Sequence, residues 1–195
     1  LQPVDKTGEN SKWISDEPYY DDYYCIWDTF RATHPLFTLL TPSKQVDMLR
    51  SLLDIYRYEG YAPDARSGDD NGRVQGGSNV DILFTDAYVK GLKGIDYELA
   101  LEAMIKNAEV SPGDDERKEG RDYNEKGFVS TKFERAGTRT MEYANCDYAI
   151  ATLARGLKEK EIAQKYMERS RNWQNLWNPD VESLGFKGFV WPRYS

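Results

Sequence analysis

Residues 79–92 read NVDILFTDAYVKGL, and their apolar side chains cover most of the circumference of a helix. Asn79 stands just before the first apolar residue, where an N-cap side chain accepts a hydrogen bond from a free backbone amide. A helix that is apolar over a wide arc is buried on several sides, whereas a helix with one apolar stripe packs at the outside of a domain. This stretch therefore predicts an inner helix.

Five further segments have helical spacing, and the inner and outer types alternate along the chain. The segments 19–33 and 138–156 are also apolar over a wide arc. The segments 41–60, 96–108 and 159–173 carry one apolar stripe opposite a charged face. This alternation indicates helical hairpins arranged in a ring, and a plain helical bundle is the alternative, although it needs fewer wide-arc helices.

Two connections are long, polar and rich in glycine, at 61–78 and 110–138. In the first, residues 76–79 lead straight into the inner helix, so we expect their amides to point toward the mouth of the ring. Residues 111–127 carry a dense run of charges, which predicts a mobile surface loop. Residues 185–190 alternate like a strand, and the sequence predicts no partner strand for them.

Composition excludes some classes of partner. The 195 residues are enough for one domain with a hydrophobic core. The net charge is −7 and the Lys and Arg residues are scattered, which argues against nucleic acid as a partner. No apolar run is long enough to span a bilayer, so we expect no membrane partner. Cys25 and Cys146 are too few for a disulfide framework and are interpreted as buried free thiols.

A series of short motifs resembles one known family. Residues 24–31 read YCIWDTFR and are followed by His34-Pro35, which resembles the Trp-Asp-Thr-Phe-Arg signature of glycoside hydrolase family 92. The resemblance spans nearly the whole chain from about residue 13. Its further segments, in the family's order, are 54–56, 60–63, 76–79, 86–91, 141–148 and 169–179.

The resemblance implies a fold. Family 92 enzymes have a ring of six helical hairpins joined to an N-terminal β-sandwich. The expected fold class is all-α: a partial (α/α)6 toroid of about three helical hairpins, with long loops and a short C-terminal β-like segment. Residues 1–195 are expected to be a fragment of this single catalytic domain, without the β-sandwich and without the C-terminal half of the ring.

The resemblance also implies an activity. Family 92 enzymes are calcium-dependent, inverting exo-α-mannosidases that trim N-glycans and mannans, so the parent protein is expected to be a secreted or periplasmic α-mannosidase with Ca²⁺ as its cofactor. The family's general acid, base and calcium ligands belong to segments beyond this sequence. No catalytic or metal residue is therefore assigned, and this chain alone is expected to be inactive. The alternatives are a non-catalytic helical module that binds a glycan or partner, and a glucoamylase-like (α/α)6 glycosidase.

Four residues are predicted to bind the substrate, a mannose-containing oligosaccharide or glycoprotein glycan. The resemblance implies that Asp28 accepts sugar hydroxyls in the mannose subsite and that Trp27 forms an apolar wall beside it. In the competing interpretation Asp28 pairs with Arg31, three residues along the same helix. Ser78 and Asn79 are expected to approach the sugar from the inner mouth, and a plain helix cap is the competing role for Asn79.

Other titratable residues receive structural roles. By residue type alone, Glu142 is a candidate general acid. Because the resemblance implies an acid further toward the C-terminus, the favoured interpretation is that Glu142 and Asp147 form a buried structural pair. Asp86 and Lys90, four residues apart, predict an internal ion pair. His34 is interpreted as structural.

Overall fold

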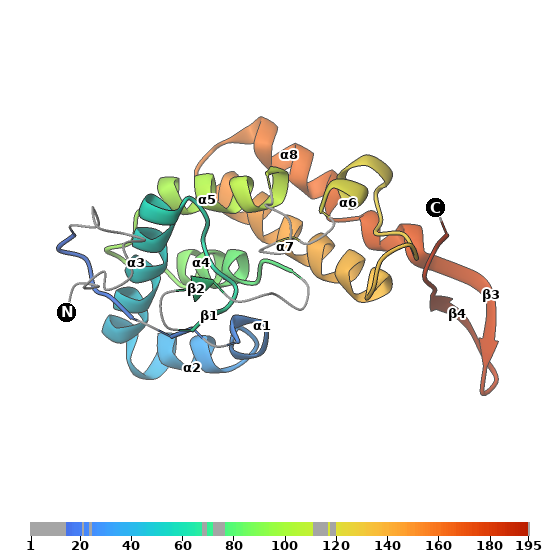
Figure 1. Cartoon of the computed structure of the whole chain (residues 1–195), viewed down its shortest axis with the longest axis horizontal. Coiled ribbons are helices and arrows are strands. Elements are labelled where there is room, and N and C mark those ends of the chain that lie inside the picture. Colours follow the sequence, from blue (N-terminus) through green and yellow to red (C-terminus); the bar gives the residue numbers. More distant parts are fainter. Residues whose placement is uncertain are drawn as a thin grey trace.

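The computed structural model describes residues 15–20, 22–23, 25–67, 70–71, 77–110, 117 and 120–194. These residues are mostly helical, as predicted (Figure 1). The helices are α1 Ile26–Thr29, α2 Thr33–Leu40, α3 Pro42–Glu59, α4 Val80–Val89, α5 Tyr97–Glu109, α6 Gly120–Lys126, α7 Ala136–Gly156 and α8 Lys160–Arg169, and the 3-10 helix η1 is Asn172–Leu176. The strands are β1 Arg66–Ser67, β2 Asp70–Asn71, β3 Trp177–Ser183 and β4 Phe186–Val190.

Local signals place the ends of several helices. Pro42 occupies the first turn of α3, where its missing N–H costs no hydrogen bond, and α3 ends at Gly60, whose φ of 88° is left-handed. Asp96 caps α5 by accepting a hydrogen bond from the backbone N–H of Leu99 at 3.0 Å. These helix ends confirm the predicted boundaries. They could be predicted because a cap depends only on residues that are close in sequence.

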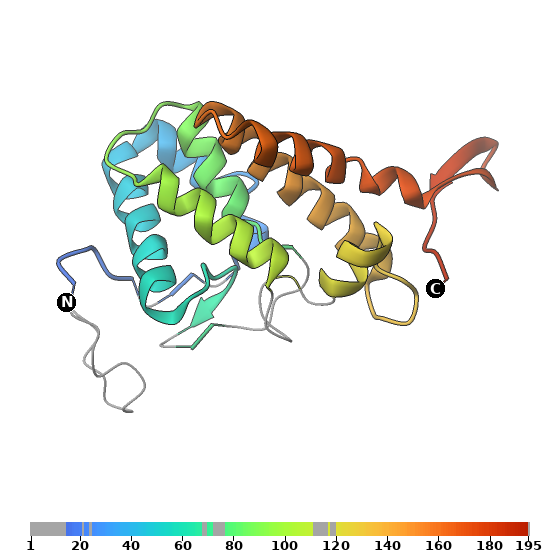
Figure 2. The ribbon, with the colours of Figure 1, turned by 90° about the horizontal axis from the view of Figure 1, so that it is seen from above.

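Helix α7 is the central element of the described structure. It contacts α4, α5, α8 and η1, and it is buried on most sides. Helix α8 runs beside α7 with only Tyr166 fully buried, so the pair has an inner and an outer member, as predicted (Figure 2). Helix α4 is likewise an inner helix.

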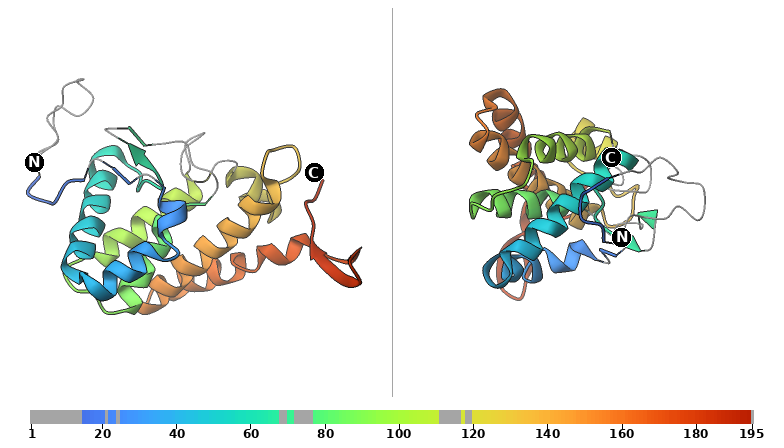
Figure 3. Two further views of the ribbon diagram at one scale, coloured as in Figure 1. Left: turned by 90° about the horizontal axis from the view of Figure 1, so that it is seen from below. Right: turned by 90° about the vertical axis from the view of Figure 1, so that its left-hand side faces the viewer.

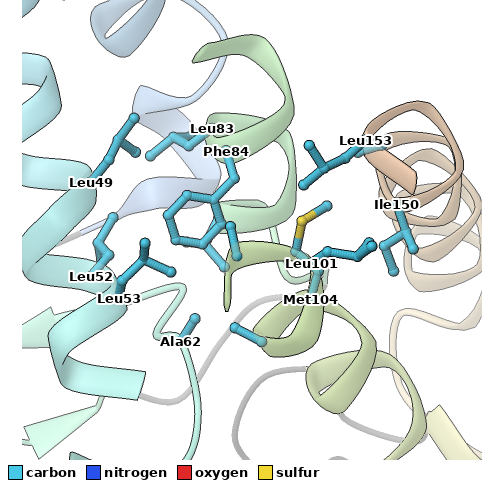
Figure 4. Packing of buried hydrophobic residues seen from close by; sticks show 14 of the residues in the cluster. Leu49, Leu52, Leu53, Ala62, Leu83, Phe84, Leu101, Met104, Ile150 and Leu153 are labelled. Carbon is cyan, nitrogen blue, oxygen red and sulfur yellow. The ribbon is translucent and has the colours of Figure 1, made fainter. Parts of the chain in front are cut away.

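The main hydrophobic core lies where α3, α4, α5 and α7 meet, around Phe84 (Figure 4). Four helices from distant parts of the chain contribute to it, so the core holds α3, α4, α5 and α7 together. Its labelled members are Leu49, Leu52, Leu53, Ala62, Leu83, Phe84, Leu101, Met104, Ile150 and Leu153.

The predicted helix at 19–33 is wrong. The described residues from 15 to 23 are neither helix nor strand, and only Ile26–Thr29 is helical before α2 begins at Thr33. Tyr20 and Tyr23 pack against α3 instead, because the backbone N–H of Tyr20 donates to Ser51 at 3.2 Å and the Tyr23 hydroxyl donates to the carbonyl of Met48 at 2.8 Å. Pro35 does not stop a helix, since it lies in the first turn of α2.

Helix α3 therefore differs from its predicted outer position. Residues 51–56 are all buried, so this part of α3 is covered on every side rather than along one stripe. Part of the cover comes from the non-helical residues near the N-terminus, where Glu17 also pairs with Arg50 at 2.7 Å.

Two further loop predictions are corrected. Within the predicted mobile loop at 111–127, residues 120–126 form α6 and Arg117 is buried, while 111–116 and 118–119 lie outside the described residues. The strand at 185–190 does have a partner: β4 pairs antiparallel with β3, and the hairpin projects away from the helices (Figure 3). A Cβ at Gly188 would meet Cη2 of Trp177 at 2.9 Å, so glycine permits the close packing of the two strands.

Cys146 is a buried free thiol, as predicted, whereas Cys25 is only half-buried. None of the described helices combines the length and the apolarity needed to cross a bilayer.

Gly156 is a point of close approach between α7 and α4. Replacing Gly156 with Ala is expected to lower the free energy of unfolding by about 1–3 kcal/mol, because the new Cβ would lie 2.6 Å from Cζ of Tyr88. In the same helix, Gly137→Ala is the matched control, since its nearest neighbour is Cγ of Pro192 at 3.6 Å. That change is expected to raise the free energy by up to about 1 kcal/mol. Urea denaturation measures the free energy of unfolding of both variants. Equal changes for Gly156→Ala and Gly137→Ala would contradict the close approach of Gly156 to Tyr88.

Candidate functional site

A pocket of about 410 Å³ lies where the α1 segment, the start of α4 and the start of α7 converge. Three of the four predicted substrate-binding residues line it: the adjacent Trp27 and Asp28, and Asn79, which is distant from them in sequence. The remaining lining residues are Arg31, Arg135, Thr138 and Glu142. Sequence reasoning missed Arg135 and Thr138 because they lie at the end of the long 110–138 connection, which carries no helical pattern.

The carboxylate of Asp28 is exposed at this pocket. Arg31 does not pair with it: its guanidinium lies 3.4 Å from Oε1 of Glu142 and 4.6 Å from the centre of the Phe30 ring. Among the residues that the structure describes, Asp28 has no ion-pair partner. The competing interpretation of Asp28 as a partner of Arg31 therefore does not hold, and the carboxylate is available to a ligand.

Asn79 has a buried side-chain amide that makes no close hydrogen bond among the described residues, although it lies near enough to the Asp64 carboxylate to lower the pKa of that group. Its backbone N–H donates to Oδ1 of Asp64 at 2.6 Å, but its side chain does not cap α4. The residue is 1% exposed, and neither Oδ1 nor Nδ2 is hydrogen-bonded within the described part of the chain. An unsatisfied buried polar group costs about 1–3 kcal/mol of stability.

Gly77 makes room for this amide. Its φ of 98° is left-handed, and a Cβ at this position would lie 3.1 Å from Nδ2 of Asn79 and 3.2 Å from Cβ of Glu142. A side chain at residue 77 would therefore be strained in its backbone and crowded against two walls of the pocket.

Ser78 is placed differently from the other predicted residues. It is fully buried and is not part of the pocket lining. Its hydroxyl donates to Oδ2 of Asp81 at 2.6 Å and accepts from Nε of Arg117 at 3.2 Å. The structure thus places Ser78 in a buried polar cluster next to the pocket.

Asp147 is the centre of that cluster. Its Oδ1 accepts from Nη1 of Arg117 at 2.6 Å, and its Oδ2 accepts from the Tyr123 hydroxyl at 2.9 Å and from Nε of Arg169 at 3.2 Å. The predicted pair of Glu142 with Asp147 is wrong. Five residues along a helix turn a side chain by about 140°, so Glu142 faces the pocket while Asp147 faces the interior.

Burial controls the protonation of two carboxyl groups in this region. It raises the pKa of Asp64 well above its usual value. Burial also raises the pKa of Asp81 to about 7, although the Arg117 charge and the Ser78 hydroxyl act in the opposite direction. Oδ2 of Asp64 and Oδ1 of Asp81 have no hydrogen-bond partner among the described residues. Neither group lines the pocket, so neither is a candidate acid or base.

Two other predictions concern residues outside the pocket. Lys90 does pair with Asp86 at 2.6 Å, but both side chains are about one-third exposed, so the pair is not internal. His34 is buried against Oε1 of Gln45 at 3.0 Å and burial lowers its pKa, which confirms a structural role. Within the described ranges, no three His, Cys, Asp or Glu side chains are grouped to hold a metal ion, so the expected calcium is assigned no ligands there.

The chain is similar to proteins of one family. A model of the glycosyl hydrolase family 92 catalytic domain matches residues 1–195. An uncharacterized secreted glycosidase from Arthroderma benhamiae is 36% identical over 214 residues, which cover 100% of this chain and 24% of that protein.

Solved structures have the same fold. The family GH92 inverting mannosidase of Bacteroides thetaiotaomicron superimposes with a TM-score of 0.78 at 34% identity, over 87% of this chain and 22% of that one. A family GH92 α-mannosidase from the same organism, in complex with mannoimidazole, superimposes with a TM-score of 0.80 at 29% identity, over 93% of this chain and 23% of that one. These neighbours fit a partial helical toroid, and this chain spans about a quarter of the length of each relative. The chain belongs to glycosyl hydrolase family 92, and residues 1–195 match its catalytic domain.

Proposed function

We propose that the chain is part of an inverting exo-α-mannosidase and that the pocket of Trp27, Asp28 and Asn79 binds a terminal mannose residue. Family membership and the two mannosidase structures support the activity. The observation that carries the site is the buried amide of Asn79, which has no hydrogen-bond partner among the described residues and lies in the same pocket as the Asp28 carboxylate.

The three side chains suit a sugar. The ring of Trp27 offers an apolar face for the C–H groups of a pyranose. Asp28 accepts hydrogen bonds from hydroxyl groups, and charged acceptors of this kind contribute about 1.5–3 kcal/mol each. The Asn79 amide both donates and accepts, which matches neighbouring hydroxyl groups on one ring.

An inverting glycosidase needs an acid and a base roughly 6.5–9.5 Å apart. We propose that both, together with the ligands of a Ca²⁺ cofactor, belong to segments of the natural protein outside residues 1–195. Ca²⁺ prefers oxygen ligands such as carboxylates, and the described residues contain no group of three or more His, Cys, Asp or Glu side chains that could hold a metal ion. We therefore assign Asp28 to the binding of the sugar, and Glu142 to the wall of the pocket.

We also propose that residues 1–195 form about half of the helical ring. An apolar hollow of about 660 Å³ lies between α7 and α8, where Met141, Tyr148 and Trp173 are 40%, 52% and 38% exposed. Exposed apolar patches of this kind mark surfaces that other elements cover. The expected substrates are mannose-containing glycans such as N-glycans or mannans, and the secreted relative supports a secreted location.

The test is an assay of the protein at its natural length. It is expected to release mannose from α-mannosides, with the β-anomer appearing first by NMR because the reaction inverts the anomeric centre. EDTA is expected to abolish the release and Ca²⁺ to restore it. Release of glucose from α-glucosides would instead indicate a glucoamylase-like enzyme, and binding without turnover would indicate a glycan-binding module.

A further inference from the structure

Arg117 is a buried cation in a stretch of sequence that otherwise reads as a solvated charge run. Its side chain is 0% exposed, and its guanidinium lies 5.6 Å from the centre of the Tyr143 ring. It pairs with Asp147 at 2.6 Å and with Asp81 at 3.3 Å, and both of these carboxylates are also 0% exposed. A cation this deeply buried must be held by specific partners.

The three nitrogen atoms of Arg117 connect the two walls of the sugar pocket. Nε donates to the hydroxyl of Ser78, the residue just before Asn79, and Nη2 donates to Asp81 in the first turn of α4. Nη1 donates to Asp147 on α7, the helix that carries Glu142. Because a guanidinium is planar and rigid, these bonds fix the distance between the Ser78–Asn79 turn and α7.

The Asn79 amide depends on such a fixed backbone. Its side-chain atoms make no close hydrogen bond within the described residues and only approach the Asp64 carboxylate, whose pKa they lower, so their direction depends mainly on the backbone of residues 78 and 79. That backbone is held by the bond from Asn79 N–H to Asp64 and by the contacts of Ser78. A misplacement of about 1 Å in a binding group can cost about 100-fold in activity.

We infer that Arg117 is a positioning residue of the sugar pocket, which sets the direction of the Asn79 amide without touching the sugar. This inference rests on the proposed mannose-binding role of the pocket. It gives Arg117, a buried residue in a charged stretch of sequence, a role in holding the Ser78–Asn79 turn against α7.

Loss of Arg117 is compatible with a folded protein. Asp147 keeps a second cation, since Nε of Arg169 lies 3.2 Å from its Oδ2. Asp81 holds a proton readily, because burial raises its pKa to about 7. In an Arg117→Met variant at pH 6, Asp147 is therefore still paired with Arg169 and Asp81 is mostly protonated. Because the variant is expected to stay folded, a loss of binding reports on positioning rather than on unfolding.

The experiment uses the protein at its natural length and mannoimidazole as the probe, the compound bound in a related α-mannosidase. Calorimetry is expected to show at least tenfold weaker binding for Arg117→Met. Arg117→Lys is expected to show a similar loss, because an ammonium lacks the fork that reaches Ser78 and Asp147 together. The matched control is Arg121→Met, four residues along and 92% exposed, which is expected to bind like the wild type. Thermal unfolding of each variant confirms that it is folded at the assay temperature.

A double-variant cycle tests whether Arg117 acts through Asn79. In an Asn79→Ala background, Arg117→Met is expected to weaken mannoimidazole binding by less than twofold further, since the group it positions is gone. A further tenfold loss of mannoimidazole binding in the Asn79→Ala background would overturn the inference but not the proposed function. Wild-type binding by folded Arg117→Met and Arg117→Lys would do the same. Absence of mannoimidazole binding and mannosidase activity in the wild type would instead overturn the proposed function and the inference with it.

Discussion

Asp147→Ala is expected to lower the free energy of unfolding by about 3–5 kcal/mol, the range measured when one partner of a buried ion pair is removed. Asp147 is fully buried and accepts hydrogen bonds from Arg117, Tyr123 and Arg169. Alanine leaves all three donors without this acceptor. Of the ion pairs that Arg117 makes with Asp147 and Asp81, it removes the shorter and leaves the pair with Asp81. The loss of pairing dominates, since the change in side-chain volume is small.

The matched control is Asp86→Ala. Asp86 also pairs with a cation, Lys90, but both side chains are about one-third exposed, and surface pairs contribute about 0–1 kcal/mol. Urea denaturation at pH 7, followed by circular dichroism, compares the two variants. A loss below about 1 kcal/mol for Asp147→Ala would show that the cluster does not depend on this carboxylate.

Asp28→Ala is expected to have the largest effect on turnover. The variant should lower kcat/KM for an α-mannoside by about 10- to 100-fold, because a hydrogen bond from a sugar hydroxyl to a carboxylate contributes about 1.5–3 kcal/mol. Stability should change by less than about 0.5 kcal/mol, since Asp28 is exposed and has no ion-pair partner among the described residues. The kcat/KM of Asp28→Asn should fall between the values of the wild type and Asp28→Ala, because the amide keeps one acceptor oxygen.

Asp16 serves as the control for this prediction. It is an exposed aspartate outside the pocket, so Asp16→Ala should retain wild-type kinetics. Steady-state assays of the protein at its natural length give kcat and KM for each variant. Wild-type turnover by Asp28→Ala would remove this residue from the subsite and leave Trp27 and Asn79 to be tested in the same way.

What the sequence predicts well is what neighbouring residues decide. The starts of α3 and α5 follow from Pro42 and Asp96, whose effects act within one turn. The inner character of α4 and α7 follows from apolar residues on most sides. The choice of Trp27, Asp28 and Asn79 came from motifs resembling a known family, and the structure adds that they share one pocket.

What the sequence does not predict depends on residues far along the chain. Tyr20 and Tyr23 have helical spacing, but in the structure they are not helical and hydrogen-bond to Ser51 and Met48 on α3. Arg117 sits in a charged stretch, and its acceptors Asp81 and Asp147 are 36 and 30 residues away. No local pattern distinguishes a buried arginine with distant partners from a solvated one.

The buried position of Arg117 also bears on how this part of the gene can vary. Residues 111–119 consist mostly of Asp, Glu, Lys, Arg, Pro and Gly, a composition whose members ordinarily replace one another with little effect on fitness. Position 117 does not share that tolerance, because even lysine keeps the charge but loses the planar fork. We therefore expect related sequences to differ less at position 117 than at the residues around it, although the composition of the stretch does not set position 117 apart.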